Sequence, residues 1–178
     1  QNNERFAGLH LDFHASLSDS GIGRGFTPRM IDSMLQLTQP DFIQVDCKGH
    51  AGISSYPTKV GSPAPAFAKD IMRIWRDVTL KHKIPLYAHY SGIWDTRAVN
   101  LHPHWARINA DGKPDPNVNS LFSAYSDSLL VPQILELATD YKLDGIWVDG
   151  DCWMLGNDYH PEAIKAYQAL YPGKTIPK

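Results

Sequence analysis

Acidic residues and histidines stand at the ends of four short apolar runs in this chain, and its chemistry is concentrated there. The candidate functional residues are Asp12, His14, Asp46, Lys48, His50, His89, Tyr90, Trp147 and Asp149. Carboxylates among imidazoles and indoles are typical of glycoside hydrolysis, in which one carboxyl group attacks or activates water and another protonates the leaving oxygen. The sequence has no phosphate-binding loop, nucleophile elbow, HExxH pair or cysteine–histidine cluster, so it predicts neither a metal nor an organic cofactor.

The segment Gly145–Asp149 carries the strongest single candidate. It is largely apolar, includes the indole of Trp147 and ends in the carboxylate of Asp149. A carboxylate at the end of a strand, beneath a surface on which a sugar ring can stack, fits a catalytic group better than a helix cap. For Asp151 the preference reverses, because capping is common two residues beyond a strand.

The elements that must position these residues follow from local patterns. Four segments have the apolar character and the Gly, Pro, Asp or Lys boundaries of buried strands, namely 6–14, 41–47, 84–90 and 143–149. Thr27 and Pro28 form a helix start, with a capping side chain and a first-turn proline before apolar residues at helical spacing. Further helical patterns cover 67–78, 129–141 and 161–170.

The order of these elements predicts the fold class. Strand and helix alternate four times, which indicates an α/β fold with a parallel sheet. The long connections, 14–26, 48–64, 91–123 and 150–160, all follow strands, as in a (β/α)8 barrel of the TIM type, whose active site is built from these loops. A doubly wound fold is the rival, but the glycine-rich segment 21–25 lacks the G-x-G-x-x-G spacing.

Length then suggests how much of a barrel is present. Four units in 178 residues are about 45 residues each, so eight units would need about 360 residues, which is within the usual barrel range. We therefore expect residues 1–178 to supply the N-terminal half of a barrel. The remaining strands would come from the parent chain, from another chain or from a second copy of this one.

Composition excludes several classes of partner. The chain has 17 Lys and Arg against 19 Asp and Glu and no basic block, so neither nucleic acid nor an anionic membrane is expected as a partner. No apolar run approaches the roughly 18 residues of a membrane-spanning helix. The two cysteines are too few to frame the fold with disulfides.

Five short motifs, in order and at suitable spacing, resemble one enzyme family. They are Phe26-Thr27-Pro28 with Asp32, Lys48-Gly49-His50-Ala51-Gly52-Ile53, His89-Tyr90-Ser91 with Trp94, Pro132-Gln133-Ile134-Leu135-Glu136-Leu137 with Tyr141, and Trp147-Val148-Asp149-Gly150. Together they resemble the catalytic barrel of the family-29 glycoside hydrolases, the α-L-fucosidases. The resemblance runs along most of the chain.

The resemblance implies a retaining exo-glycosidase that acts on terminal α-L-fucosides. By this resemblance Asp149 would be the nucleophile and Trp147 would line the same subsite, while His14, His50 and Tyr90 would contact the sugar. The general acid/base would lie beyond Lys178. The partner would be a fucosylated glycan, and the protein would be secreted or periplasmic.

The remaining strand-end residues are assigned to the sugar site by position alone. Asp12, Asp46 and His89 are placed with the substrate-binding set. For Lys48, pairing with Asp46 or Asp12 and contact with a ligand are equally good readings.

The sequence also departs from the family pattern. Gly49 and Ala51 replace a histidine and an aspartate of the second motif, and Ala15 stands where the family usually has tryptophan. These changes remove sugar contacts, so a modified fucose or another sugar is an alternative. A glycosidase of another barrel clan, similar to the α-galactosidases, and a sugar-binding protein that has lost catalysis are the two other readings.

Overall fold

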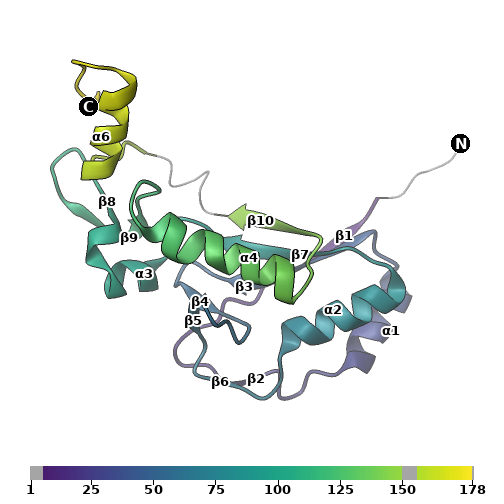
Figure 1. Cartoon of the computed structure of the whole chain (residues 1–178). Coiled ribbons are helices and arrows are strands. Elements are labelled where there is room, and N and C mark those ends of the chain that lie inside the picture. Colours follow the sequence, from purple (N-terminus) through teal and green to yellow (C-terminus); the bar gives the residue numbers. More distant parts are fainter. Residues whose placement is uncertain (1–5, 150–155, 178) are drawn as a thin grey trace, which may run out of the picture.

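The computed structural model describes residues 6–149 and 156–177, and a parallel sheet runs through the middle of this part of the chain (Figure 1). Its four parallel strands are β1 (Gly8–Leu11), β3 (Phe42–Lys48), β7 (Leu86–Ser91) and β10 (Gly145–Asp149). They lie side by side in chain order, β1 against β3, β3 against β7 and β7 against β10. Each of the four predicted strands is therefore confirmed, with the first shorter than expected.

Three helices cover one face of this sheet: α1 (Pro28–Thr38), α2 (Ile71–His82) and α4 (Val131–Asp140), the last preceded by a π-helical turn at Ser126–Leu130 (Figure 1). The capping signals act as the sequence predicts, since the side chains of Thr27 and Asp70 accept the amides of Met30 and Arg73. The helices and the facing side of the strands enclose the main core, which includes Ile31, Leu35, Ile43, Val45, Met72, Trp75, Leu86, Ala88 and Leu137.

The opposite face of the sheet carries polar and aromatic side chains. Because successive strand residues alternate in direction, Gln44 and Tyr87 point away from the helices that their neighbours contact. Here Phe42 and Tyr87 lie 5.8 Å apart, edge to face, and each ring fills the space beside a glycine of the flanking strand, Gly8 or Gly145. This face has no helical cover in the described part of the chain.

The loops that follow the strands are long and partly structured. They contain β2 (Ser20–Ile22) paired with β6 (Ala66–Phe67), and β4 (Ile53–Ser54) paired with β5 (Ser62–Pro63). The loop after β7 forms α3 (Thr96–Leu101), a 3-10 turn (Pro103–Trp105) and a hairpin of β8 (Ala106–Ile108) and β9 (Pro114–Asn119). The predicted enrichment of loops at the carboxyl edge of the sheet is thus confirmed.

The last helix, α6 (Pro161–Leu170), is attached to this hairpin (Figure 1). The amide of Tyr159 donates to the carbonyl of Ile108 at 2.8 Å, and Nε2 of His160 lies 3.0 Å from the carbonyl oxygen of His104. The predicted helix is therefore present, but it is held by a loop of the preceding unit, unlike the three helices that pack on the sheet.

The fold class follows from strand order and layering. A parallel α/β fold is confirmed, and the doubly wound rival does not fit, because that fold reverses its strand order and places helices on both faces. The barrel itself stays a prediction, since closure requires more strands than the described residues form. Within those residues no helix has the length and apolar character needed to span a membrane.

Candidate active site

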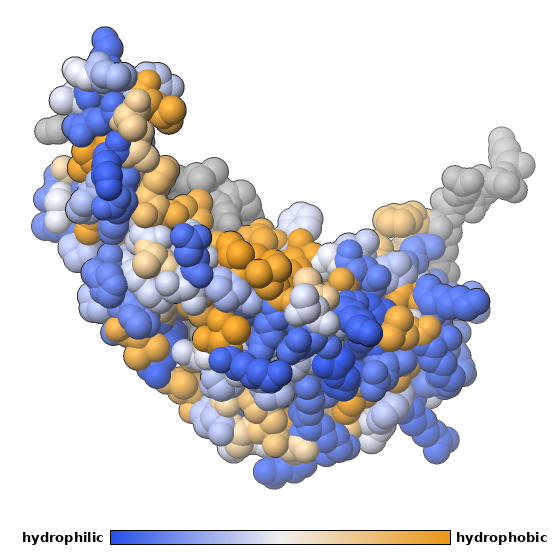
Figure 2. All heavy atoms as spheres, in the orientation of Figure 1, coloured by the Kyte–Doolittle hydropathy of each residue, from blue (hydrophilic) through white to orange (hydrophobic). Residues whose placement is uncertain are grey.

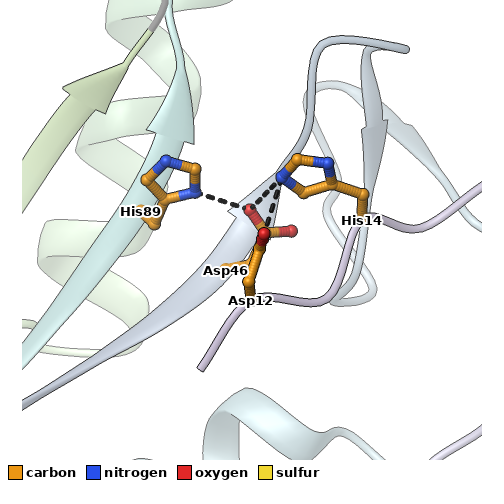
Figure 3. Close-up of side chains that lie close together, drawn as sticks. All are labelled: Asp12, His14, Asp46 and His89. Carbon is orange, nitrogen blue, oxygen red and sulfur yellow. Dashed lines mark hydrogen bonds and ion pairs between the residues drawn. The ribbon is translucent and has the colours of Figure 1, made fainter. Parts of the chain in front are cut away.

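Four of the candidate side chains meet at the carboxyl edge of the sheet (Figure 3). Asp12 and His14 follow β1, while Asp46 and His89 lie near the ends of β3 and β7. The Oδ1 atom of Asp46 lies 2.8 Å from Nδ1 of His89 and 3.7 Å from Nε2 of His14, which is itself 2.9 Å from Oδ1 of Asp12. We call these four residues the Asp46 cluster. Its members come from three adjacent strands because parallel strands end at the same edge of the sheet.

Asp149 joins this cluster from β10. Its Oδ2 atom lies 3.2 Å from Nε2 of His89 and 3.8 Å from Nε2 of His50. Its side chain is 24% exposed, so it can be reached from solvent, whereas the side chain of Asp46 is buried. The structure therefore brings Asp12, His14, Asp46, His50, His89 and Asp149 together, as their positions at strand ends predict.

His50 is held in a defined orientation. Its ring stacks on Trp94 with centroids 4.3 Å apart and planes 5° apart, and its Nδ1 contacts the hydroxyl of Ser91. That hydroxyl donates to the carbonyl of Trp94 at 2.7 Å, so its oxygen is left to accept from Nδ1 of His50. Burial lowers the pKa of His50. Both observations favour the neutral ring with its proton on Nδ1, so that Nε2, which lies 3.8 Å from Oδ2 of Asp149, is an acceptor.

His89 has the opposite character. Its hydrogen bond to Asp46 raises its pKa above the ordinary value for histidine, and Asp149 adds to this effect. Burial raises the pKa of Asp46, against the influence of His89. No hydrogen-bond partner for the second oxygen of Asp46 occurs among the described residues. The ring of His89 thus lies between two carboxylates, both of which favour its protonated form.

The same cluster has the donor types of a metal site. One ligand atom from each of Asp12, His14, Asp46 and His89 lies within 4.8 Å of the others. Two of these pairs already touch at hydrogen-bond length, 2.8 Å and 2.9 Å. A chain of hydrogen bonds accounts for these contacts without an ion, although the set of ligands would suit a divalent cation.

Two predicted sugar contacts are corrected by the structure: Lys48 and Tyr90. Both side chains are buried on the helix side of the sheet, with 1% and 0% of their surface exposed. Nζ of Lys48 lies 2.7 Å from Oδ2 of Asp95, not near Asp46 or Asp12, and the hydroxyl of Tyr90 donates to Oε1 of Gln133 at 2.7 Å. Neither side chain is therefore exposed at the site.

Lys48 points to the helix side because the pairing of β3 with β7 is irregular. Simple alternation would place Lys48 on the same face as Asp46. The register between β3 and β7 shifts between these two residues, so that Asp46 pairs with His89 but Lys48 pairs with Tyr90. One extra residue in β3 therefore turns Lys48 toward the helices, where its ammonium lies 4.3 Å from the centre of the Tyr90 ring.

Two further positions complete the site. Trp147 pairs with His89 in register, on the side of the sheet away from the helices, and is 61% exposed. At Gly49 an added Cβ would lie 2.8 Å from Cγ of His14, so the ring of His14 occupies the space that a larger residue at position 49 would need. The glycine at position 49, which replaces a histidine of the family motif, therefore leaves room for the ring of His14.

Ser91 and Trp94 orient His50, and the sequence pattern alone indicates no role for either. Both belong to a motif of the fucosidase resemblance, and that was the only signal available. Asp151, considered above as a cap, lies outside the described residues.

A cavity of about 370 Å³ opens next to the cluster, between the ends of β1 and β3 and the start of α2. Its wall is mainly apolar and includes Ile22, Phe26 and Trp75, and Asp12 and Asp46 also line it. The Asp46 cluster therefore has an open space beside it.

Solved structures similar to this chain include α-L-fucosidases. Isoenzyme 2 of the α-L-fucosidase from Paenibacillus thiaminolyticus matches 93% of this chain with a TM-score of 0.77 and 26% identity. An α-L-fucosidase from Lactobacillus casei in complex with its α-L-fucose product matches 83% of the chain with a TM-score of 0.55 and 18% identity. A hypothetical protein from Ruminiclostridium thermocellum matches 96% of the chain with a TM-score of 0.61 and 14% identity. No family model and no curated protein match the sequence.

The predicted resemblance to α-L-fucosidases is confirmed by these structures. What they share with this chain is a mixed α/β fold with a parallel sheet. The chain spans 26% of the Paenibacillus protein and 49% of the Lactobacillus protein, but 95% of the Ruminiclostridium protein. The described chain therefore corresponds to only part of the two fucosidases.

Proposed function

We propose that this chain carries the nucleophile half of a retaining glycoside hydrolase that removes terminal α-L-fucosyl residues. The observation that carries the proposal is Asp149, a partly exposed carboxylate at the end of β10, in contact with His89 and beside His50. A neighbouring imidazolium favours the ionised carboxylate that nucleophilic attack on the anomeric carbon requires. The similarity to α-L-fucosidase structures supports fucose as the sugar.

Substrate contacts in this proposal come from groups with free hydrogen-bonding capacity. The Nε2 lone pair of His50 can accept a sugar hydroxyl next to Asp149, because Nε2 and the carboxylate oxygen are both acceptors, lie 3.8 Å apart and form no hydrogen bond with each other. The side chains of Asp12 and His14 are 56% and 46% exposed at the same edge. Trp147 offers an exposed indole face for stacking against the sugar ring.

The rest of the site would come from outside these residues. We propose that residues 1–178 form the first four units of a (β/α)8 barrel and that the general acid/base belongs to the other half, about 5–5.5 Å from Asp149. Two features support a missing neighbour. The run of four parallel strands ends at β1 on one side and at β10 on the other. Apolar side chains also gather on the surface over α4, where Val131 and Leu135 are 47% and 56% exposed (Figure 2).

The test is hydrolysis of an aryl α-L-fucoside by the longest natural protein that contains this chain. Asp149→Asn should lower kcat by about three orders of magnitude or more, since it removes the nucleophile without changing the size of the side chain. Asp111→Asn is the matched control, because Asp111 is exposed in the β8–β9 hairpin and distant from the cluster in the chain. Near-normal activity of Asp149→Asn would refute the proposal.

A sugar-binding protein without catalysis is the second candidate. It is favoured by one observation: both carboxylates of the Asp46 cluster, Asp46 and Asp12, are engaged by a histidine. Incubation with a 2-fluoro-fucosyl fluoride separates the two functions. A covalent adduct on Asp149, seen by intact mass and peptide mapping, supports the hydrolase, whereas binding without an adduct supports the sugar-binding protein. A panel of aryl glycosides separates fucosidase from α-galactosidase-like specificity.

A further inference from the structure

His89 is placed differently from the other histidines of the site. Its Nδ1 lies 2.8 Å from Oδ1 of Asp46, and its Nε2 lies 3.2 Å from Oδ2 of Asp149. Both ring nitrogens are therefore taken by carboxylates that lie on opposite sides of the ring, on β3 and β10. No ring nitrogen is left for a sugar hydroxyl, which argues against the substrate-binding role assigned to His89 from its position in the sequence.

We propose that Asp46, His89 and Asp149 form a positioning relay, in which His89 holds and orients the Asp149 carboxylate and Asp46 fixes the ring of His89. This inference rests on the proposed function and deepens it. His89 and Asp46 act through Asp149, so they are positioning residues and do not themselves touch the substrate.

The geometry gives each member a distinct task. Asp46 is buried and lies opposite His89 in register, so it is a fixed acceptor for Nδ1–H. His89 is itself buried, which keeps water away from the contact. Asp149 is the exposed end of the chain of contacts and the one member that a ligand can reach. A carboxylate that accepts from a fixed imidazolium is restricted in rotation and kept ionised.

The charge of the His89 ring depends on the groups that surround it. The groups that face its ring are Asp46 from β3, Asp149 from β10, and two histidines of the first strand and its loop. His10 contacts it edge to face at 5.0 Å between ring centroids, and His14 lies parallel to it at 6.0 Å. The two carboxylates bind the ring nitrogens directly and favour the proton on His89, whereas the two histidines make only ring–ring contacts with it.

His50 provides the contrast at the same carboxylate. Its Nδ1 donates to Ser91, and its Nε2 presents a lone pair at 3.8 Å from Oδ2 of Asp149. The two histidines beside Asp149 therefore divide their roles. The protonated His89 orients the carboxylate, and the neutral His50 stays available to the sugar.

The relay is testable without any enzymatic assay, by NMR titration of the histidine rings in the intact protein. His89→Gln identifies the His89 signals. In the native protein His89 should be doubly protonated at neutral pH and titrate above its ordinary pKa. Asp46→Asn should lower that midpoint by roughly one pH unit or more, because it removes the main anionic partner. Asp149→Asn, a change at a more exposed position, should lower it by less. His10→Gln, which alters a neighbour that meets His89 through a ring–ring contact, is the matched control and should leave the midpoint in place.

A second readout is the pH profile of α-L-fucoside hydrolysis. The basic limb of kcat/KM should fall at lower pH in Asp46→Asn than in the native enzyme and should not move in His10→Gln. If the protein proves not to hydrolyse glycosides, the NMR result still decides the relay, so the two failures are distinguishable. An unchanged His89 midpoint in Asp46→Asn would overturn the relay in favour of isolated side chains. Stoichiometric binding of Zn²⁺ that removes one of the two ring N–H protons of His89 would overturn it in favour of a metal site.

Discussion

The buried ion pair between Lys48 and Asp95 allows a sharp test of whether Lys48 is structural or binds ligand. Both side chains are almost fully buried, at 1% and 2% exposure, and the Nζ–Oδ2 distance is 2.7 Å. Tyr125 also contributes, with its hydroxyl 3.2 Å from Nζ of Lys48. Lys48→Met keeps the length and apolar packing of the side chain but removes the cation. Asp95 is then left as a buried carboxylate without its partner.

The expected loss follows from this burial. Breaking a buried pair by removing one partner costs about 3–5 kcal/mol of unfolding free energy, because the remaining charge is no longer compensated. For a protein of this size each kcal/mol lowers Tm by roughly 2–4 °C, so Lys48→Met should lower Tm by roughly 6–20 °C. Asp95→Asn should destabilise by a similar amount, because it leaves the buried ammonium of Lys48 without its carboxylate, even though Asn can still cap α3 by accepting the amide of Ala98, as Asp95 does at 2.8 Å.

The assay is urea unfolding of the native protein, Lys48→Met, Asp95→Asn and the double variant, followed by far-UV circular dichroism. Lys59→Met is the matched control, because Lys59 pairs with Asp140 at 3.0 Å but is 81% exposed. That exposed pair should be worth less than about 1 kcal/mol. The double variant should lose less than the sum of the single changes. If Lys48→Met destabilises no more than Lys59→Met, the structural reading of Lys48 is refuted. Should Lys48→Met fail to fold, Asp95→Asn and the double variant still provide the comparison.

Two further predictions concern the site. Gly49→Ala should displace the ring of His14, since the added Cβ would lie 2.8 Å from that ring, and should lower the free energy of unfolding by about 1–3 kcal/mol. Gly25→Ala is a suitable control, because open space surrounds Gly25. Gly112→Ala is not, because the φ of Gly112 is +75°. Changes confined to the His14 NMR signals would support this, and unchanged His14 signals would contradict it. For pH, the folded-state pKa of His89 lies above the unfolded value of 6.5, so its contribution to stability is fully present below about pH 6.5 and is lost as pH rises through the folded-state pKa. His89→Gln should therefore remove part of the fall in unfolding free energy on this alkaline side, and equal slopes in the two proteins would show that His89 does not cause it.

Local patterns predicted the elements of this fold well. The strands at Phe42–Lys48 and Gly145–Asp149 are short apolar runs, and the helix at Pro28–Thr38 has its cap and apolar stripe within about a dozen residues. Such features depend on neighbours in the chain, so they can be read from the sequence. Chain-order pairing of the strands also follows, because successive βα units pack side by side.

Side-chain partners were less accessible to such reasoning. The motifs of the resemblance include Gln133 and Glu136, but they do not indicate what these two side chains contact. In the structure both are buried, and they tie α4 to the loop after β3: Gln133 donates to Ser54, and Glu136 accepts from Tyr56 and from the amide of Lys59. The motif was visible, while its structural use required the positions of two segments that are nearly 80 residues apart.

The sequence by itself determined that carboxylates and histidines stand at the carboxyl ends of parallel strands, and hence that they gather at one edge. Only the tertiary structure decided which of them face the site. One extra residue in the pairing of β3 with β7 sends Lys48 to the helix side, and the register of β3, β7 and β10 puts His89 between Asp46 and Asp149. The physical reason is that the direction of a side chain depends on strand register, and register is set by contacts with other strands, not by the residues next to it in the chain.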